Sequence, residues 1–182
     1  MNDKKGYENS LQSVIKWLKK SYHATDKKGF SIGFDIRKGW SAPYSETTGY
    51  IIPTLYRYAS INNDHESAEI ATAAADWLIS IQNENGSIND FVGKARNFQK
   101  REPVVFNTGQ DLFGLLSAFR YSNDSRYLES AKRAALWIIS KQDESGLWND
   151  KSNAMYDEND DLAQLSQTGR YYIGGILSHA SA

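Results

Sequence analysis

The sequence contains no cysteine among its 182 residues. Disulfide bonds, thiolate zinc sites and a cysteine nucleophile are therefore excluded. It also lacks a long apolar run, and none follows the N-terminal stretch Met-Asn-Asp-Lys-Lys-Gly. No signal peptide or membrane span is visible, so a cytoplasmic location is the default expectation.

The chain has no excess of charge of either sign, with 21 basic and 22 acidic residues and a net charge of -1. A nucleic acid or an anionic membrane would need a basic excess, so neither is expected as the main partner. Phosphate loops, dinucleotide fingerprints and nucleophile elbows are missing. The three histidines, His23, His65 and His179, are scattered along the chain, so we expect no metal site and no cofactor.

The clearest positive feature of the sequence is an internal repeat of 60 residues. Landmarks at this spacing are the tryptophans Trp17, Trp77 and Trp137 and the pairs Thr48-Gly49, Thr108-Gly109 and Thr168-Gly169. A fixed period of this length indicates a repeat architecture, in which each unit buries its apolar face against its neighbours. We expect one domain over residues 1–182, with repeats at about 1–62, 63–122 and 123–182.

Each repeat is predicted to contain an outer amphipathic helix followed by a long loop and an inner helix. In the second repeat the outer helix runs from about Asp64 to Ile81, because Ile70, Ala74 and Trp77 recur at helical spacing. Asp64 and Asp124 stand where N-caps belong. The three tryptophans are expected in the core.

The inner helices are predicted at Tyr50 to Ile61, Gln110 to Tyr121 and Arg170 to Ala182. They are apolar nearly all round, which is typical of buried helices. Aligned glycines, such as Gly49 and Gly109, cost helix stability, and close helix approach is the expected compensation.

Outer and inner helices that alternate in this way predict an all-α fold of three helical hairpins, half of an (α/α)6 toroid. Half a ring would leave two apolar edges. Three alternatives remain open: the chain is truncated at the C-terminus relative to a longer protein, a homodimer completes the ring, or the hairpins form a shallow open arc.

Two motifs carry a resemblance to known families. The segment Gln142-Asp-Glu-Ser-Gly-Leu-Trp148 resembles the repeat of terpenoid-cyclase and prenyltransferase toroids. The inner-helix starts, such as Phe106-Asn-Thr-Gly-Gln-Asp, look like those of six-hairpin glycosidase-like bacterial proteins of polysaccharide metabolism. Terpenoid chemistry is disfavoured, because Asp157-Glu-Asn-Asp-Asp161 does not match the cyclase acid motif and no cysteine is present for a prenyltransferase zinc site.

In such a ring the long loops and the N-termini of the inner helices share one rim, where long loops are often functional. Glu46 and Asp111 lie on neighbouring inner-helix starts, about 8–10 Å apart by helix spacing, which would suit an inverting pair of carboxylates. The candidate substrate-binding residues of this rim are Asp35, Trp40, Tyr44, Phe106, Asn107, Gln110, Arg170 and Tyr171.

Structural roles compete with these assignments. Glu46 and Asp111 would each be favourable charges at a helix N-terminus. Asn107 and Gln110 fit an N-cap and its reciprocal partner. Thr48, Thr108 and Thr168 are better explained as caps than as ligands.

The resemblance and the rim together predict a carbohydrate-active protein that binds an oligosaccharide or polysaccharide and acts, if it is an enzyme, as a hydrolase, lyase or epimerase. Glu46 and Asp111 would be acid and base, Arg170 would hold an anionic sugar group, and Trp40 and Tyr44 would stack on sugar rings. The alternatives are a non-catalytic module that binds a glycan or a protein, and an isoprenoid-handling toroid.

Overall fold

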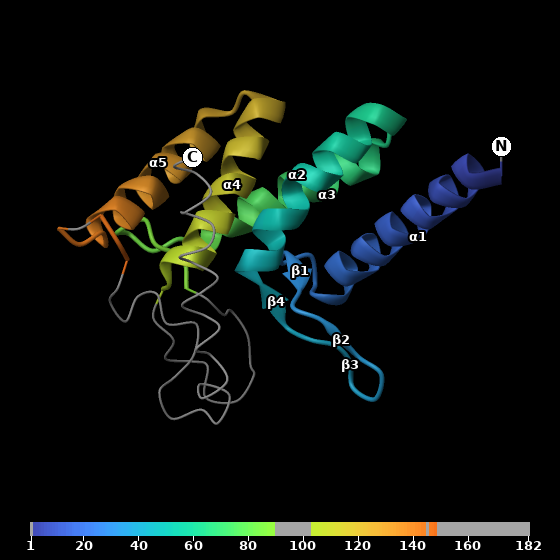
Figure 1. Ribbon diagram of the computed structural model, residues 1–182, viewed down its shortest axis with the longest axis horizontal. Coiled ribbons are helices and arrows are strands. Elements are labelled where there is room, and N and C mark those ends of the chain that lie inside the picture. Colours follow the sequence, from blue (N-terminus) through green and yellow to red (C-terminus); the bar gives the residue numbers. More distant parts are fainter. Residues whose placement is uncertain (1, 90–102, 145, 149–182) are drawn as a thin grey trace.

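The computed structural model describes residues 2–89, 103–144 and 146–148, and this part of the chain is mostly helical (Figure 1). Its helices are α1 (Asn2–Ala24), α2 (Ser45–Asn62), α3 (His65–Ile81), α4 (Val105–Ser122) and α5 (Ser125–Ser140). Four short strands lie between α1 and α2: β1 (Phe30–Ser31), β2 (Phe34–Asp35), β3 (Gly39–Trp40) and β4 (Pro43–Tyr44).

The 60-residue period is confirmed in the helices from α2 to α5. The bounds of α4 are those of α2 displaced by 60 residues, and α5 begins 60 residues after α3. The junctions repeat as well. Asn63 and Asn123 end their helices in the left-handed region, with φ of 53° and 58°. Asp64 and Asp124 then cap the next helix, as predicted, by accepting from the N–H groups of Ser67 and Arg126.

The outer helix of the second repeat is confirmed with the predicted bounds. Ile70, Ala74, Trp77 and Leu78 of α3 are buried, because the apolar stripe faces the core formed with α2 and α4. In the third repeat Trp137 is also buried, with 6% of its surface exposed.

Close approach of the inner helices is confirmed at two glycines. A Cβ added to Gly49 would lie 2.4 Å from the carbonyl oxygen of Gln110, and one added to Gly114 would lie 3.0 Å from the Cα of Gly49. The absence of side chains therefore lets α2 and α4 pack backbone to backbone. At Gly109 the nearest such atom is 4.0 Å away, so its glycine is not required by a neighbour among the described residues.

The first loop was expected to be irregular, but it forms a β-hairpin over residues 30–44. Strand β1 pairs antiparallel with β4, and β2 with β3, with Phe30 opposite Tyr44 and Phe34 opposite Trp40. The Asp35 carboxylate accepts from the N–H groups of Arg37 and Lys38 at 2.8 Å and closes the turn. The prediction of an all-α chain was therefore wrong at this segment.

Other helix predictions need correction. Helices α2 and α4 begin five residues earlier than expected, so Thr48 and Thr108 lie inside the helices, whose N-cap positions are Tyr44 and Val104. The inner helices are not buried all round, since half of the Phe113 surface is exposed.

Helix α1 differs from the other outer helices. Its C-terminal half is docked through buried Ile15 and Tyr22, and the Lys19 ammonium lies 2.9 Å from the Asp64 carboxylate. Residues 6–14 are all exposed, and the N-terminal end points away from the other helices in Figure 1. Trp17 was predicted in the core but is 46% exposed.

The structure thus shows a mostly helical chain of hairpins but does not show a toroid. The predicted third inner helix, residues 170–182, lies outside the described residues, as do Thr168 and Gly169. None of the helices within the described ranges is long and apolar enough to cross a membrane.

Candidate functional site

The first turns of α2 and α4 lie against each other and bring four of the predicted site residues together. The Tyr44 hydroxyl donates to the Glu46 carboxylate at 2.8 Å, and the Asn107 side-chain amide donates to the Tyr44 hydroxyl oxygen at 3.0 Å. Asp111 lies one turn further along α4 and interacts electrostatically with Glu46. We call Tyr44, Glu46, Asn107 and Asp111 the carboxylate cluster.

Asp111 is the most unusual member of the cluster, because its side chain is completely buried. Burial raises the pKa of its carboxyl well above the ordinary value; the Ser45 hydroxyl opposes this shift and the Glu46 charge adds to it. Neither carboxylate oxygen has a hydrogen-bond partner of normal geometry. The Ser45 hydroxyl instead donates to the Asn89 carbonyl at 3.2 Å, so its oxygen is available to accept a proton from a neutral Asp111.

A neutral carboxylic acid beside a second carboxyl group is an arrangement that can hold and release a proton. The environment of Asp111 favours the protonated acid, so Asp111 is better suited to donate a proton than to accept one. No histidine contributes, and no group of three or more metal-ligating side chains occurs within the described ranges.

The remaining predicted site residues do not join the cluster through any contact in the described part of the chain. Trp40 packs against Trp17 and Phe34, with ring centroids 4.6 Å and 5.1 Å away, and Asp35 closes the hairpin turn. Gln110 contributes its backbone to the Gly49 contact. Phe106 lies partly buried in the first turn of α4. Arg170 and Tyr171 lie outside the described residues.

Three assignments based on helix caps were wrong. Asn107 is inside α4 and does not cap it, and the Tyr44 contact replaces the predicted capping role. Thr48 and Thr108 each bind the backbone of the preceding loop: the Phe30 N–H donates to Thr48 Oγ1 at 2.9 Å, and the Ile88 N–H donates to Thr108 Oγ1 at 3.2 Å. These threonines therefore fix the loop to the inner helix in both repeats.

Sequence reasoning overlooked Ser45, which is fully buried and bridges α2 to Asn89. The available signal was its place directly before Glu46, in the turn that leads into the inner helix. The predicted role of Gln82 and Gly86 in tying the loop to neighbouring helices is confirmed. Gln82 Nε2 donates to the Gly86 and Ser130 carbonyls at 2.9 and 3.0 Å.

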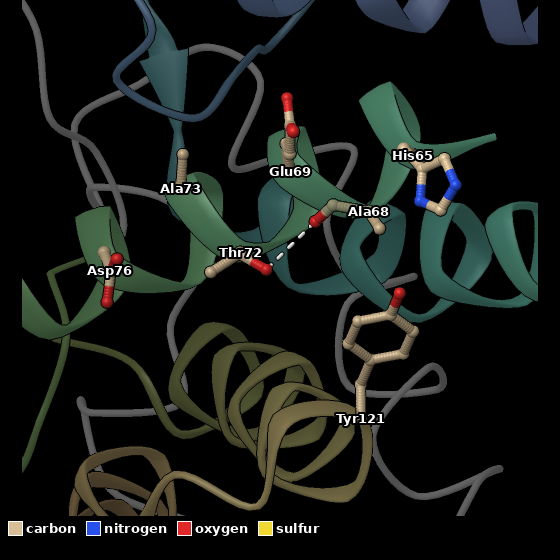
Figure 2. Close-up of a pocket in the computed structure, with 7 residues that line it drawn as sticks. All are labelled: His65, Ala68, Glu69, Thr72, Ala73, Asp76 and Tyr121. Atoms are coloured by element: carbon tan, nitrogen blue, oxygen red, sulfur yellow. Dashed lines mark hydrogen bonds between the residues drawn. The ribbon is translucent and has the colours of Figure 1, made fainter.

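A second concave site lies on the other side of α3, with a volume of about 410 Å³ (Figure 2). Its lining consists of His65, Ala68, Glu69, Thr72, Ala73, Asp76 and Tyr121. Figure 2 shows that all of these except Tyr121 come from one helix. Asp76 is already bound by the Tyr127 hydroxyl at 2.9 Å and by Arg126 at 3.3 Å, so this pocket offers few free polar groups.

Comparison with known proteins gives a match at the C-terminal end of the chain. The family model of the glutamine synthetase catalytic domain matches residues 144–182. A glutamine synthetase of Sulfolobus acidocaldarius is 60% identical over 37 residues, which are 20% of this chain and 8% of that protein. The chain therefore covers only a small fraction of this curated relative. No solved structure matches.

These matches overturn the carbohydrate interpretation. The resemblance to six-hairpin glycosidase-like toroids was wrong as a family assignment, and with it the predicted polysaccharide function and glycan partner. Thr168, Gly169, Arg170 and Tyr171 belong to the matched segment. One signal was present in the sequence: beyond Trp148 only the Thr-Gly pair continues the repeat, whereas Ser166-Gln167 replaces the earlier Phe106-Asn107.

Proposed function

We propose that this chain has a glutamine-synthetase-like function, the formation of glutamine from glutamate and ammonia at the expense of ATP. One observation carries the proposal: the similarity at residues 144–182 is high, with 60% identity over 37 residues. The repeat period is supported independently by the offsets of α2 to α5, which end before or at the start of the matched segment. The chain would thus join helical hairpins to a part of a catalytic domain.

The proposal includes an amino acid and a nucleotide as ligands. Both carry anionic groups, a carboxylate and a phosphate chain. Arg170 is the only arginine in residues 144–182, and a guanidinium binds carboxylate and phosphate oxygens through paired hydrogen bonds. Arg170 is therefore the residue in the matched segment that we propose to hold an anionic substrate group.

Because the matched segment is 8% of its relative, the rest of a complete site would have to come from other polypeptide. A segment of this length cannot bury enough surface to form a catalytic domain alone. We therefore propose that the chain works as part of an oligomeric assembly.

Enzyme assay tests the proposal directly. The purified full chain is incubated with glutamate, ammonium and ATP with magnesium, and glutamine, ADP and phosphate are measured. We expect the three products in equal amounts and a rate that rises faster than linearly with chain concentration, as assembly requires. If no glutamine forms at any chain concentration, the proposal is wrong for this chain.

A matched pair of arginine variants sharpens the assay. Arg170→Ala should lower the rate at least about tenfold, the loss expected for a missing charge-assisted hydrogen bond. Arg120→Ala, an exposed arginine of α4 outside the matched segment, should leave the rate unchanged. Equal effects of the two substitutions would contradict the assigned role of Arg170.

We also propose that Glu46 and Asp111 remain the proton-transferring pair of the hairpins. The support is the complete burial of Asp111 and its electrostatic contact with Glu46. The substrate-binding roles of Asp35, Trp40, Tyr44, Phe106, Asn107, Gln110 and Tyr171 likewise stay predictions.

A further inference from the structure

The N-terminal part of the chain carries an apolar surface that no described residue covers. On α1 it consists of Tyr7, Leu11, Val14 and Trp17, which are 74%, 46%, 53% and 46% exposed. Their spacing of three and four residues places them along one side of the helix. On the hairpin it continues through Phe34 and Ile36, which are 47% and 93% exposed. We call this set the N-terminal apolar surface.

Aromatic contacts join the two halves of this surface. The Trp17 ring lies 5.3 Å from Phe34 and 4.6 Å from Trp40, measured between centroids. The hairpin turn is held by the two hydrogen bonds to Asp35. Ile36 is therefore presented at the tip of a fixed structure, and helix and tip form one continuous feature.

The basic residues of the chain are concentrated in the same part. Residues 1–44 contain nine Lys or Arg and four Asp or Glu, a net charge of +5, whereas the remaining 138 residues carry -6. Lys16, Lys20, Arg37 and Lys38 are exposed. On α1 the helical spacing places Lys16 and Lys20 away from the line of Leu11 and Val14. The balanced total charge hides this asymmetry, and the expectation against an anionic surface partner rested on that total.

The repeat argues against another hairpin as the partner of α1. The positions of Leu11 and Val14 correspond to Ala71 and Ala74 in α3 and to Ala131 and Ala134 in α5. Those four alanines are at most 2% exposed, because a small side chain lets the neighbouring helix approach closely. Larger side chains at these positions on α1 are unsuited to that close packing.

We propose that the N-terminal apolar surface docks onto the surface of an anionic lipid bilayer. A helix with an apolar face, lysines on its other faces and neighbouring aromatic rings lies in the plane of a membrane interface without spanning it. Indole rings favour the headgroup level, which suits Trp17 and Trp40. The basic residues supply attraction to anionic headgroups. The apolar side chains of α1 and Ile36 enter the boundary of the acyl chains.

Sedimentation with vesicles tests this proposal. The full chain is mixed with vesicles of phosphatidylcholine alone or of phosphatidylcholine with phosphatidylserine. We expect binding to the anionic vesicles, with a blue shift of tryptophan fluorescence, and weakening of this binding as salt is added. Absence of binding to both vesicle types would overturn the proposal, as would equal binding to both.

Variants identify the surface. Leu11→Ser with Val14→Ser should weaken binding at least tenfold, and Arg37→Gln with Lys38→Gln should weaken it by about fivefold per charge. Matched controls on the other helices are Leu136→Ser with Ile139→Ser, at positions 68% and 60% exposed, and Arg57→Gln with Arg120→Gln, at exposed positions. The controls should bind as the parent does, and circular dichroism should confirm that all variants are folded.

Two further measurements separate other occupants of the surface. If solution mass shows a dimer that Leu11→Ser with Val14→Ser converts to monomer, the surface binds a second copy of the chain and the lipid proposal is wrong. Equal affinity for single-stranded DNA and for anionic vesicles would show a general response to basic charge and would also overturn it.

Discussion

Asp111 combines an ionisable side chain with complete burial, so its protonation is coupled to folding. Its folded-state pKa is raised well above the ordinary value of 3.8, and the folded protein therefore retains the proton at pH values where the unfolded chain has lost it. Stability must fall as pH rises between the unfolded and the folded pKa. The slope that one group adds is at most about 1.4 kcal/mol per pH unit.

The substitution Asp111→Asn removes this coupling. We expect the free energy of unfolding of the variant to fall less between acid and alkaline pH than that of the parent. Urea unfolding at a series of pH values measures the difference, in which the contributions of all other groups cancel. Glu46→Gln is the companion variant: the Glu46 charge raises the pKa of Asp111, so its removal should reduce the parent's loss of stability. Parallel curves for all three proteins would contradict this account.

Thr48 is a second residue whose role follows from one buried contact. The side chain is fully buried, and its hydroxyl accepts the Phe30 N–H and donates to the Tyr44 carbonyl at 2.7 Å. Thr48→Val preserves the shape but leaves the Phe30 N–H without its acceptor, at a cost of about 1–3 kcal/mol. Thr47→Val is the control, because the Thr47 hydroxyl satisfies no buried loop N–H in the described contacts. Denaturant unfolding should show a clearly larger loss for Thr48→Val.

Among the elements, α2 and α4 depend most strongly on side-chain size at their contact. Gly49→Ala would place a Cβ 2.4 Å from a backbone oxygen that cannot rotate away. We expect a loss of about 1–3 kcal/mol in the free energy of unfolding, since overpacking outweighs the better helix propensity of alanine.

The equivalent glycine of α4 provides an internal control. Gly109 has open space, with its nearest atom 4.0 Å from an added Cβ, so Gly109→Ala should stabilise the protein by up to about 1 kcal/mol. Opposite signs for the two substitutions, measured by thermal or urea unfolding, would confirm that the contact and not the residue type decides the effect. A loss of stability in both would contradict it.

Helix α1 is predicted to be unevenly stable along its length. Residues 6–14 are exposed, whereas Ile15, Tyr22 and the Lys19 pairs with Asp64 and Glu66 hold the second half. Hydrogen exchange should therefore be faster at the amides of residues 6–14 than at those of α3, because local opening there breaks few packing contacts. Equal protection along α1 would show that its first half is covered in solution.

At the scale of the whole molecule, the features predicted from sequence were those set by periodicity. The 60-residue offset, the caps at Asp64 and Asp124 and the buried stripe of α3 follow from spacing alone, and all are observed. The β-hairpin was missed because its strands are two residues long and alternate too briefly to register as a pattern. Trp17 was misplaced because the repeat predicts equivalent surroundings, and α1 has no preceding inner helix in the described structure.

The candidate site was predictable only in part. Tyr44, Glu46, Asn107 and Asp111 do lie together, because the inner helices begin side by side. Their roles as helix caps or charges at a helix end could not reveal that Asp111 is sealed from solvent. Function was predicted wrongly because a two-residue landmark, Thr168-Gly169, extended the repeat into a segment that belongs to another family model.

The matching offsets of α2 to α4 and of α3 to α5 make the hairpin a unit of construction. Each inner helix meets the next through one glycine contact, and each threonine fastens its own loop. A gene carrying residues 63–122 twice in tandem would supply every partner that the added unit needs. Its product should lengthen by one hairpin and gain the stability of one extra interface, as expected for a linear array of neighbours.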